Sequence, residues 1–164
     1  MPRFGQNLRS ILKQKNFDIS DSSKFQIGLN ILNMLELVHK SGYVYNDLKF
    51  ENILLSSVQC VPDESTDDDK DSFMKAKLVL TDFGLATRWK DSKTGKHIKQ
   101  SELSCFGGNL YFASINQLQF LRTSRRDDLH SLMYMMIYLM NRGTIASVSK
   151  ALDSDDLSPQ QKMK

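Results

Sequence analysis

Apolar residues recur at helical spacing in the first third of the chain. Four of them form the stripe of an amphipathic helix: Ile31, Leu32, Leu35 and Val38. Ser23 and Gln26 have the spacing of a capping box, which places the start of this helix at Ser23. Gly42 is well placed to end the helix in a left-handed conformation. A shorter helix is predicted before it, around Leu8 to Lys15.

A third helix is predicted from Asp127 to about Asn141. This stretch is apolar nearly all round, which is typical of a helix in the core of a domain. Its most apolar part, Leu129 to Met140, is only twelve residues long. Because a bilayer span needs about 20 apolar residues, this is expected to be a buried helix and not a membrane segment.

Two short apolar runs, Ile53 to Leu55 and Lys77 to Leu80, predict a β-hairpin whose connection is lengthened. The connection, about residues 57–76, is rich in aspartate, poor in apolar residues, and expected to be a mobile acidic insertion. Residues 85–124 lack sustained periodicity and are expected to be ordered but irregular. We therefore predict one domain at residues 1–146 and a polar tail at residues 147–164.

Composition narrows the class of protein. A chain of 164 residues, 40% hydrophobic and 25% charged, can bury one core and is ordinary for a globular domain. Its net charge of +3 is too small to indicate nucleic-acid binding. Cys60 and Cys105 show no metal-ligand spacing, and Met1 to Gly5 carry no signal-peptide core. We expect reduced thiols, and a cytoplasmic or nuclear location.

Four polar residues on two neighbouring loops carry candidate chemistry: Asp47, Lys49, Asn52 and Asp82. Phosphoryl transfer needs such a set, because its work is mostly positioning and neutralising negative charge. Asp47 is the candidate general base, and Lys49 the candidate contact for the transferred phosphate. Asn52 and Asp82 offer the oxygen ligands that Mg²⁺ prefers when nucleotide phosphates complete its shell.

Each of these signals has a structural alternative when it is taken alone. An Asp-x-Lys sequence is usually a surface ion pair, and Asp82-Phe83-Gly84 could be a turn after a strand. Together, in this order and between a helix and a strand pair, they favour a phosphotransferase site.

These residues resemble the large lobe of a eukaryotic protein kinase and, within that superfamily, the casein kinase 1 family. The pattern H-R-D-x-K-x-x-N is matched at its Asp, Lys and Asn positions, and D-F-G is matched from Asp82 to Gly84. Three further segments resemble casein kinase 1 motifs: Lys90 to Ile98, Ala113 to Asn116 and Ser124 to Leu129. The resemblance covers roughly residues 5–142.

The resemblance implies a mainly α fold with a small β-hairpin, and a protein serine/threonine kinase that uses ATP and Mg²⁺. Asp47 and Lys49 would be catalytic, with Lys49, Asn52 and Asp82 binding the cofactors and the last two ligating the metal. It also implies that Asp128 holds the backbone of the loop at residues 45–52, which we call the catalytic loop.

Several positions depart from the family pattern. Tyr45 and Asn46 replace the His and Arg before the catalytic Asp, so phosphorylation of the activation loop is not expected to act as a switch. Asn109 replaces a Thr that bonds the catalytic Asp and Lys, and its amide could substitute. Only 46 residues precede Asp47, and none of them forms a glycine-rich loop. We therefore expect the small lobe to be absent, the domain to be partial, and ATP binding to be weak or absent.

Basic residues cluster between positions 88 and 99: Arg88, Lys90, Lys93, Lys96 and Lys99. We call residues 88–99 the basic segment. Arg88, Lys90 and Lys93 are candidates for binding acidic or already phosphorylated protein substrates, which the family prefers. A solvated charged loop is an equal alternative. Two other functions stay open: an inactive pseudokinase that acts as a scaffold, and a small-molecule kinase of related fold.

Overall fold

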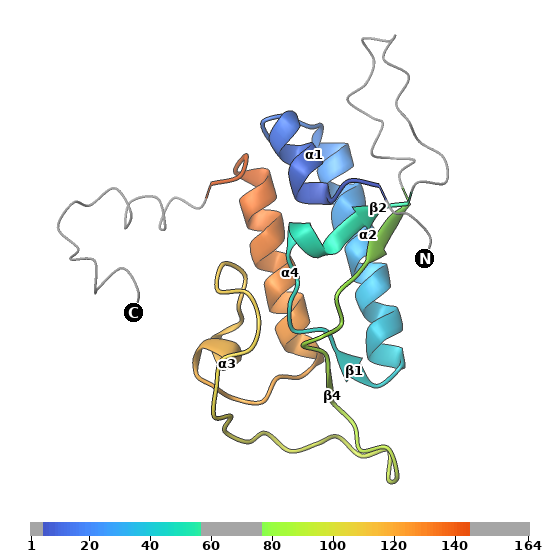
Figure 1. The fold of residues 1–164 in the computed structure, drawn as a ribbon, viewed down its shortest axis with the longest axis vertical. Helices are drawn as coiled ribbons and strands as arrows, with labels where there is room; N and C mark the ends of the chain where they lie inside the picture. The colour runs from blue at the N-terminus through green and yellow to red at the C-terminus, as the bar shows by residue number, and fades with distance from the viewer. Residues whose placement is uncertain (1–4, 57–76, 145–164) are drawn as a thin grey trace, which may run out of the picture.

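The computed structural model describes residues 5–56 and 77–144. The expected acidic insertion, the polar tail and Cys60 lie outside these residues. Two long helices, α2 (Asp21–Lys40) and α4 (Arg125–Met140), lie side by side. The short helix α1 (Leu8–Gln14) packs over the loop that follows α2, and the four-residue helix α3 (Ile115–Leu118) lies near the start of α4 (Figure 1).

Helix α2 begins earlier than its sequence predicts. Ser20, in extended conformation, is the N-cap, and its Oγ accepts a hydrogen bond of 3.1 Å from the backbone N–H of Ser23. Ser23 itself lies inside the helix and is fully buried. The predicted start is therefore wrong by three residues, because Ser20 also fits the cap and Ile19 before it is buried in the core. Gly42, with φ of 93°, follows the helix as predicted.

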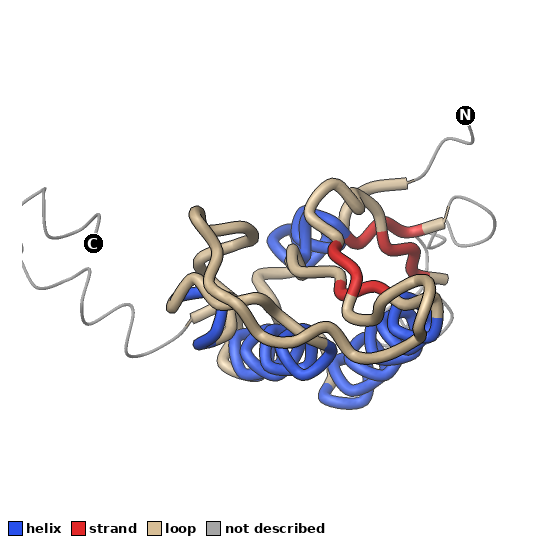
Figure 2. The backbone as a smooth tube through the Cα atoms, turned by 90° about the horizontal axis from the view of Figure 1, so that it is seen from below, coloured by secondary structure: helices blue, strands red, loops and turns tan. Residues whose placement is uncertain are grey.

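The described residues form two small antiparallel sheets, where the sequence predicts one hairpin. Strands β2 (Ile53–Leu55) and β3 (Leu78–Leu80) pair as predicted, with Ile53 opposite Leu80. Strands β1 (Tyr43–Val44) and β4 (Thr87–Arg88) form a second pair that the sequence analysis missed. Two-residue strands are too short to carry a periodic signal. Figure 2 shows the strands of both sheets, in red, close to the helices.

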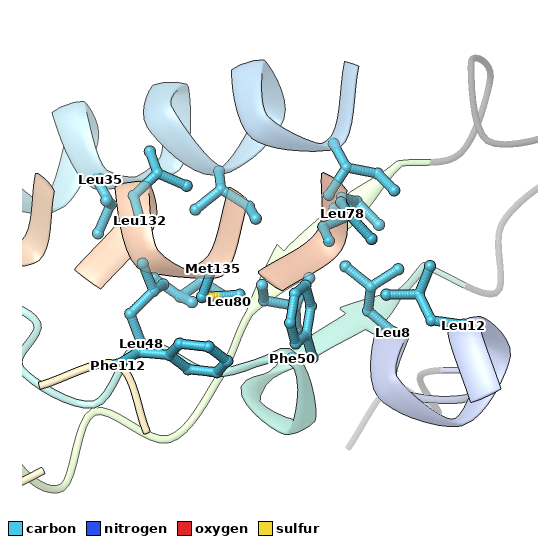
Figure 3. Close-up of a cluster of buried hydrophobic side chains, with 14 of the residues drawn as sticks. Leu8, Leu12, Leu35, Leu48, Phe50, Leu78, Leu80, Phe112, Leu132 and Met135 are labelled. Carbon is cyan, nitrogen blue, oxygen red and sulfur yellow. The ribbon is translucent and has the colours of Figure 1, made fainter. Parts of the chain in front are cut away.

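The core lies between α1, α2, α4 and the catalytic loop (Figure 3). Leu8 and Leu12 of α1 and Met135 of α4 enter it, together with Phe50 of the 3₁₀ helix η1 (Phe50–Asn52). Phe50 also meets Phe112 edge to face, with ring centroids 5.7 Å apart. The loop that carries the candidate chemistry is therefore anchored to the core by buried apolar side chains such as Phe50.

Helix α4 is less enclosed than expected. Leu132, Met135 and Leu139 are buried, as predicted for a core helix. However, three residues on another side are about half exposed: Leu129 at 43%, Met133 at 51% and Ile137 at 44%. The expectation of burial all round is therefore wrong for the described structure. No helix in residues 5–56 and 77–144 is long and apolar enough to cross a membrane.

Residues 85–124 are mostly irregular, as predicted, with β4 and α3 as their regular elements. Trp89 attaches the start of this stretch to the two long helices. Its Nε1–H donates to the carbonyl of His39 at 2.9 Å, and the Arg125 guanidinium lies 3.8 Å from the centre of its ring. The Arg125 contact is a cation–π interaction.

Candidate active site

Two residues of the candidate site have unusual backbone conformations. Asn46 has φ of 71° and Asp82 has φ of 57°, both in the left-handed region. Residues other than glycine rarely adopt this region, although Asn and Asp tolerate it better than most. Such conformations persist only where surrounding contacts enforce them, and they concentrate at functional sites.

Asp128 fixes the backbone of the catalytic loop. Its carboxylate, only 1% exposed, accepts hydrogen bonds of 2.8 Å from the backbone N–H groups of Tyr45 and Asn46. His39 of α2 lies 2.7 Å from the same carboxylate through Nε2. The contact implied by the family resemblance is confirmed, and His39 is an additional partner that sequence analysis did not identify.

The structure brings Asp47, Lys49 and Asn52 together. The Lys49 amine donates to Oδ2 of Asp47 at 2.6 Å, and the Asn52 amide nitrogen donates to the same oxygen at 3.0 Å. Asn52 also donates to the Asp47 carbonyl at 3.0 Å. Asp47 is 5% exposed and Asn52 6%, whereas the Lys49 side chain is 28% exposed. The aspartate is therefore held by one oxygen at the bottom of the site, with the amine nearer the solvent.

Asp82 joins this group through its neighbour Thr81. Both the N–H and the hydroxyl of Thr81 donate to the carbonyl of Asn52, at 2.9 and 3.0 Å. The carbonyl of Thr81 in turn accepts a 2.5 Å hydrogen bond from the Tyr45 hydroxyl. The strand that ends before Asp82 is therefore bonded directly to the catalytic loop.

The fully buried Tyr45 lies between the loop that carries Asp47 and the residue before Asp82, because its hydroxyl bonds the Thr81 carbonyl. Burial raises the pKa of the Tyr45 phenol far above its usual range, while the Asn52 side chain opposes this shift. The charges of Asp47, Asp82 and Asp128 raise the pKa further. Asp47 and Asp82 thus both lie within electrostatic reach of one hydroxyl group. Tyr45 also meets Phe83 edge to face, with ring centroids 5.3 Å apart.

Comparison with known protein families identifies the family to which this chain belongs. Residues 3–163 match the family described as the protein kinase domain. The chain belongs to the protein kinase family. This kinase chain is 36% identical over 115 residues to "Casein kinase 1-like protein HD16" of Oryza sativa subsp. japonica, which confirms the resemblance drawn from sequence. It is 29% identical over 137 residues to "B1 kinase" of Monkeypox virus.

The matches cover 70% and 82% of the kinase chain but only 15% and 40% of the two relatives. The chain therefore spans less than half the length of either relative. The family match confirms a kinase domain, with its helices and small sheets, as the fold class. It does not confirm that the small lobe is absent, and that expectation stays a prediction.

Membership of the protein kinase family implies the use of ATP and Mg²⁺, and the oxygen donors of the site suit Mg²⁺. The amide nitrogen of Asn52 donates hydrogen bonds to Asp47, so its amide oxygen is the atom suited to bind a cation. Asp82 supplies a carboxylate. The described residues contain no group of three or more His, Cys, Asp or Glu that could hold a metal ion. Two protein oxygens completed by nucleotide phosphates are a usual arrangement for Mg²⁺.

Asn109 does not take over the role that its position suggested. Its side-chain oxygen accepts from the N–H of Tyr111 at 2.8 Å. Within residues 5–56 and 77–144 it makes no hydrogen bond to Asp47 or Lys49. The amide of Asn109 therefore does not substitute for the threonine in this structure, because its oxygen closes a local turn instead.

The three basic candidates are not gathered around Asp47. The Arg88 guanidinium lies 5.2 Å from the centre of the Tyr43 ring, and the Lys90 amine 5.4 Å from that of Trp89. Lys93 is exposed, and its backbone N–H donates to Asp91 at 3.0 Å. Lys90 also lines an open groove of about 740 Å³ between α2, Trp89 and the start of α4. Their role in binding anionic substrates stays a prediction.

Proposed function

We propose that this chain is the catalytic part of a serine/threonine protein kinase of the casein kinase 1 type. The proposal depends mainly on one observation: Lys49 and Asn52 both donate hydrogen bonds to the same oxygen of Asp47. The 36% identity to a casein kinase 1-like protein supports the type. A lysine two residues after the aspartate is the serine/threonine pattern of the family, which favours Ser or Thr over Tyr as acceptor.

In the proposed reaction a protein hydroxyl attacks the γ-phosphorus of ATP, and the bond to the β–γ bridging oxygen breaks. The phosphoryl group ends on the Ser or Thr oxygen, ADP leaves, and the hydroxyl proton passes to Asp47. Oδ2 of Asp47 is occupied by Lys49 and Asn52, which leaves Oδ1 facing the incoming hydroxyl as proton acceptor. The Lys49 amine, nearer the solvent, is placed to neutralise the transferred phosphate.

Asn52 and Asp82 would hold Mg²⁺, which supplies charge neutralisation for the phosphates. Thr81 fixes their relative position by its two hydrogen bonds to the Asn52 carbonyl. We further propose acidic or phosphorylated substrates, received by Arg88, Lys90 and Lys93, and a cytoplasmic or nuclear location.

The test is phosphotransfer to an acidic Ser/Thr peptide by the chain itself, compared with Asp47→Asn. We expect the variant to lose at least ~10²-fold in turnover while its circular dichroism stays unchanged. Asp18→Asn, which removes an exposed carboxylate far in sequence from both the site and the basic segment, is the matched control and should keep full activity. Equal turnover of the native chain and Asp47→Asn would reject Asp47 as the base.

The orientation of the Asn109 side chain favours a second candidate function, a non-catalytic scaffold. This side chain bonds the N–H of Tyr111 and, in the part of the chain that the structure describes, makes no hydrogen bond to Asp47 or Lys49. Titration calorimetry separates the two. A kinase must bind ATP with Mg²⁺, whereas a scaffold with normal peptide binding and undetectable nucleotide binding would support the second candidate. We expect weak nucleotide binding by this chain, so micromolar affinity would contradict that expectation.

A further inference from the structure

The Asn46 side chain uses all of its hydrogen-bonding groups on distant parts of the chain. Its amide nitrogen donates to the carbonyl of Leu85 at 2.8 Å and to the Thr87 hydroxyl at 2.9 Å. Its amide oxygen accepts from the Thr123 hydroxyl at 2.6 Å. Because a carbonyl can only accept, the Leu85 contact fixes which way the amide points. Asn46 is 8% exposed, so its amide is largely shielded from water, although Leu85 and Thr87 are exposed.

The Asn46 backbone makes a second set of contacts. Its carbonyl accepts from the Gln117 amide nitrogen at 2.8 Å, and the same nitrogen donates to the carbonyl of Gly107 at 3.0 Å. Gly108 comes so close that a Cβ on it would lie 2.7 Å from the Asn46 carbonyl oxygen. The backbone of Asn46 is thus linked to residues 107–108 through Gln117.

These two sets of contacts reach two arms of one irregular stretch. Residues 84–87 form its outgoing arm, just after Asp82, and residues 103–107 its returning arm. Both arms line a cavity of about 330 Å³, and Asn46 and Gln117 line it as well. The side chain of Asn46 holds the outgoing arm and also bonds Thr123, whereas its carbonyl holds the returning arm through Gln117.

We propose that Asn46 is a positioning residue that holds both arms against the catalytic loop through uncharged hydrogen bonds. Asparagine suits this position because it tolerates φ of 71° and also carries an amide. Glycine would accept the backbone but make no side-chain bonds, and aspartate would turn two donors into acceptors. Since every bond is neutral, the arms are held without a charged modification and with little sensitivity to salt.

The test is hydrogen–deuterium exchange on the chain alone, read by mass spectrometry on peptides covering 84–88 and 103–108. Asn46→Gly keeps the backbone conformation and the carbonyl but removes three side-chain hydrogen bonds. We expect exchange at 84–88 to rise about tenfold or more, with 107–108 and the helices α2 and α4 unchanged. Raising the salt to about 1 M should leave the native pattern as it is.

Gln117→Glu is the matched variant for the returning arm. It keeps the side-chain oxygen that accepts from the Ser114 N–H, but it loses the nitrogen that donates to Asn46 and Gly107. Exchange should rise at 103–108 and stay unchanged at 84–88. Thr87→Val, at an exposed residue, is a milder variant that removes one acceptor and should raise exchange at 84–88 only slightly.

Unchanged exchange at 84–88 in Asn46→Gly, or an equal rise over the whole chain, would overturn the proposal. Any effect on phosphotransfer rests on the proposed function, so exchange is the deciding measurement. A chain with the expected exchange pattern and no phosphotransfer would refute the kinase proposal and leave the positioning role intact.

Discussion

The catalytic loop and the basic segment are held in contrasting ways. Tyr45 and Asn46 are fixed by Asp128, which lies 83 and 82 residues away, and Asn46 also meets Gln117, 71 residues away. In the basic segment, Asp91 accepts from Lys93 and Thr94, two and three residues away. The loop is buried and polar, whereas the segment is exposed and bonded mainly to itself.

This contrast shows what each region depends on. The geometry of the catalytic loop depends on the whole fold, because its partners come from α2, α4 and the irregular stretch. The basic segment forms a local turn, closed by hydrogen bonds between Asp91 and both Gly95 and Lys96, and attached to the helices through Trp89. Substitutions in the loop should therefore affect stability and activity together, whereas those in the segment should affect binding alone.

The largest expected effect is that of Asp128→Asn. An amide can accept only one of the two backbone bonds and turns a donor toward the other N–H. We expect the free energy of unfolding, measured in urea, to fall by about 3 kcal/mol. Asp91→Asn, at an exposed carboxylate of the basic segment, should leave it nearly unchanged. Similar losses in both variants would contradict the contrast between the two regions.

Gly108→Ala should have the next largest effect. Gly108 has φ of 129°, and an added Cβ would lie 2.6 Å from the Gln117 amide nitrogen. We expect a loss of about 2 kcal/mol in the free energy of unfolding. Gly107→Ala is a matched control, because a Cβ there meets nothing within 4 Å. If both variants lose the same stability, the close approach of Gly108 to Asn46 and Gln117 is not needed.

Tyr45→Phe should cost about 1 kcal/mol, because the Thr81 carbonyl loses a hydroxyl donor while the contact of the ring with Phe83 is kept. The effect also depends on pH. The folded pKa of Tyr45 is raised, so its contribution is fully present below the unfolded pKa near 10.0 and declines at higher pH. Urea unfolding at several alkaline pH values should show a shallower decline for Tyr45→Phe. Parallel pH profiles would exclude a raised pKa.

The smallest effect on stability is expected for the double change Lys90→Glu and Lys93→Glu. Both residues lie in the basic segment, and we expect the free energy of unfolding to change by less than about 0.5 kcal/mol. Affinity for an acidic peptide at low salt should fall about tenfold. Lys13→Glu with Lys77→Glu makes the same change in charge at exposed lysines elsewhere. Equal losses of affinity in the two variants would mean that the segment is only a solvated loop.

Short-range signals predicted the elements that depend on local sequence. The stripe from Ile31 to Val38 indicated α2, and Gly42 its end. The runs at Ile53 and Leu78 indicated the β2–β3 hairpin. The helix start at Ser23 was wrong because two serines fit the cap, and only the burial of Ile19 separates them. The β1–β4 pair was missed because two residues cannot show a period of two.

The residues of the candidate site could be predicted only where they lie together in a short sequence motif. Asp47, Lys49 and Asn52 lie close in sequence and meet in the structure. The contacts of Asn46, Gln117 and Thr123 could not be predicted, because no local pattern marks partners separated by 71 and 77 residues. Asn109 shows the converse limit, since a position inferred from a family pattern does not fix where an amide points.

Trp89 is the single tryptophan of the chain, and its indole lies at the junction of the basic segment with α2 and α4. Its fluorescence therefore reports on this junction without any added label. Detachment of the segment would bring water to the indole and shift its emission to longer wavelength, while the helical far-ultraviolet signal stayed constant. Separation of the two optical signals during denaturation would thus reveal whether the segment leaves before the helices unfold.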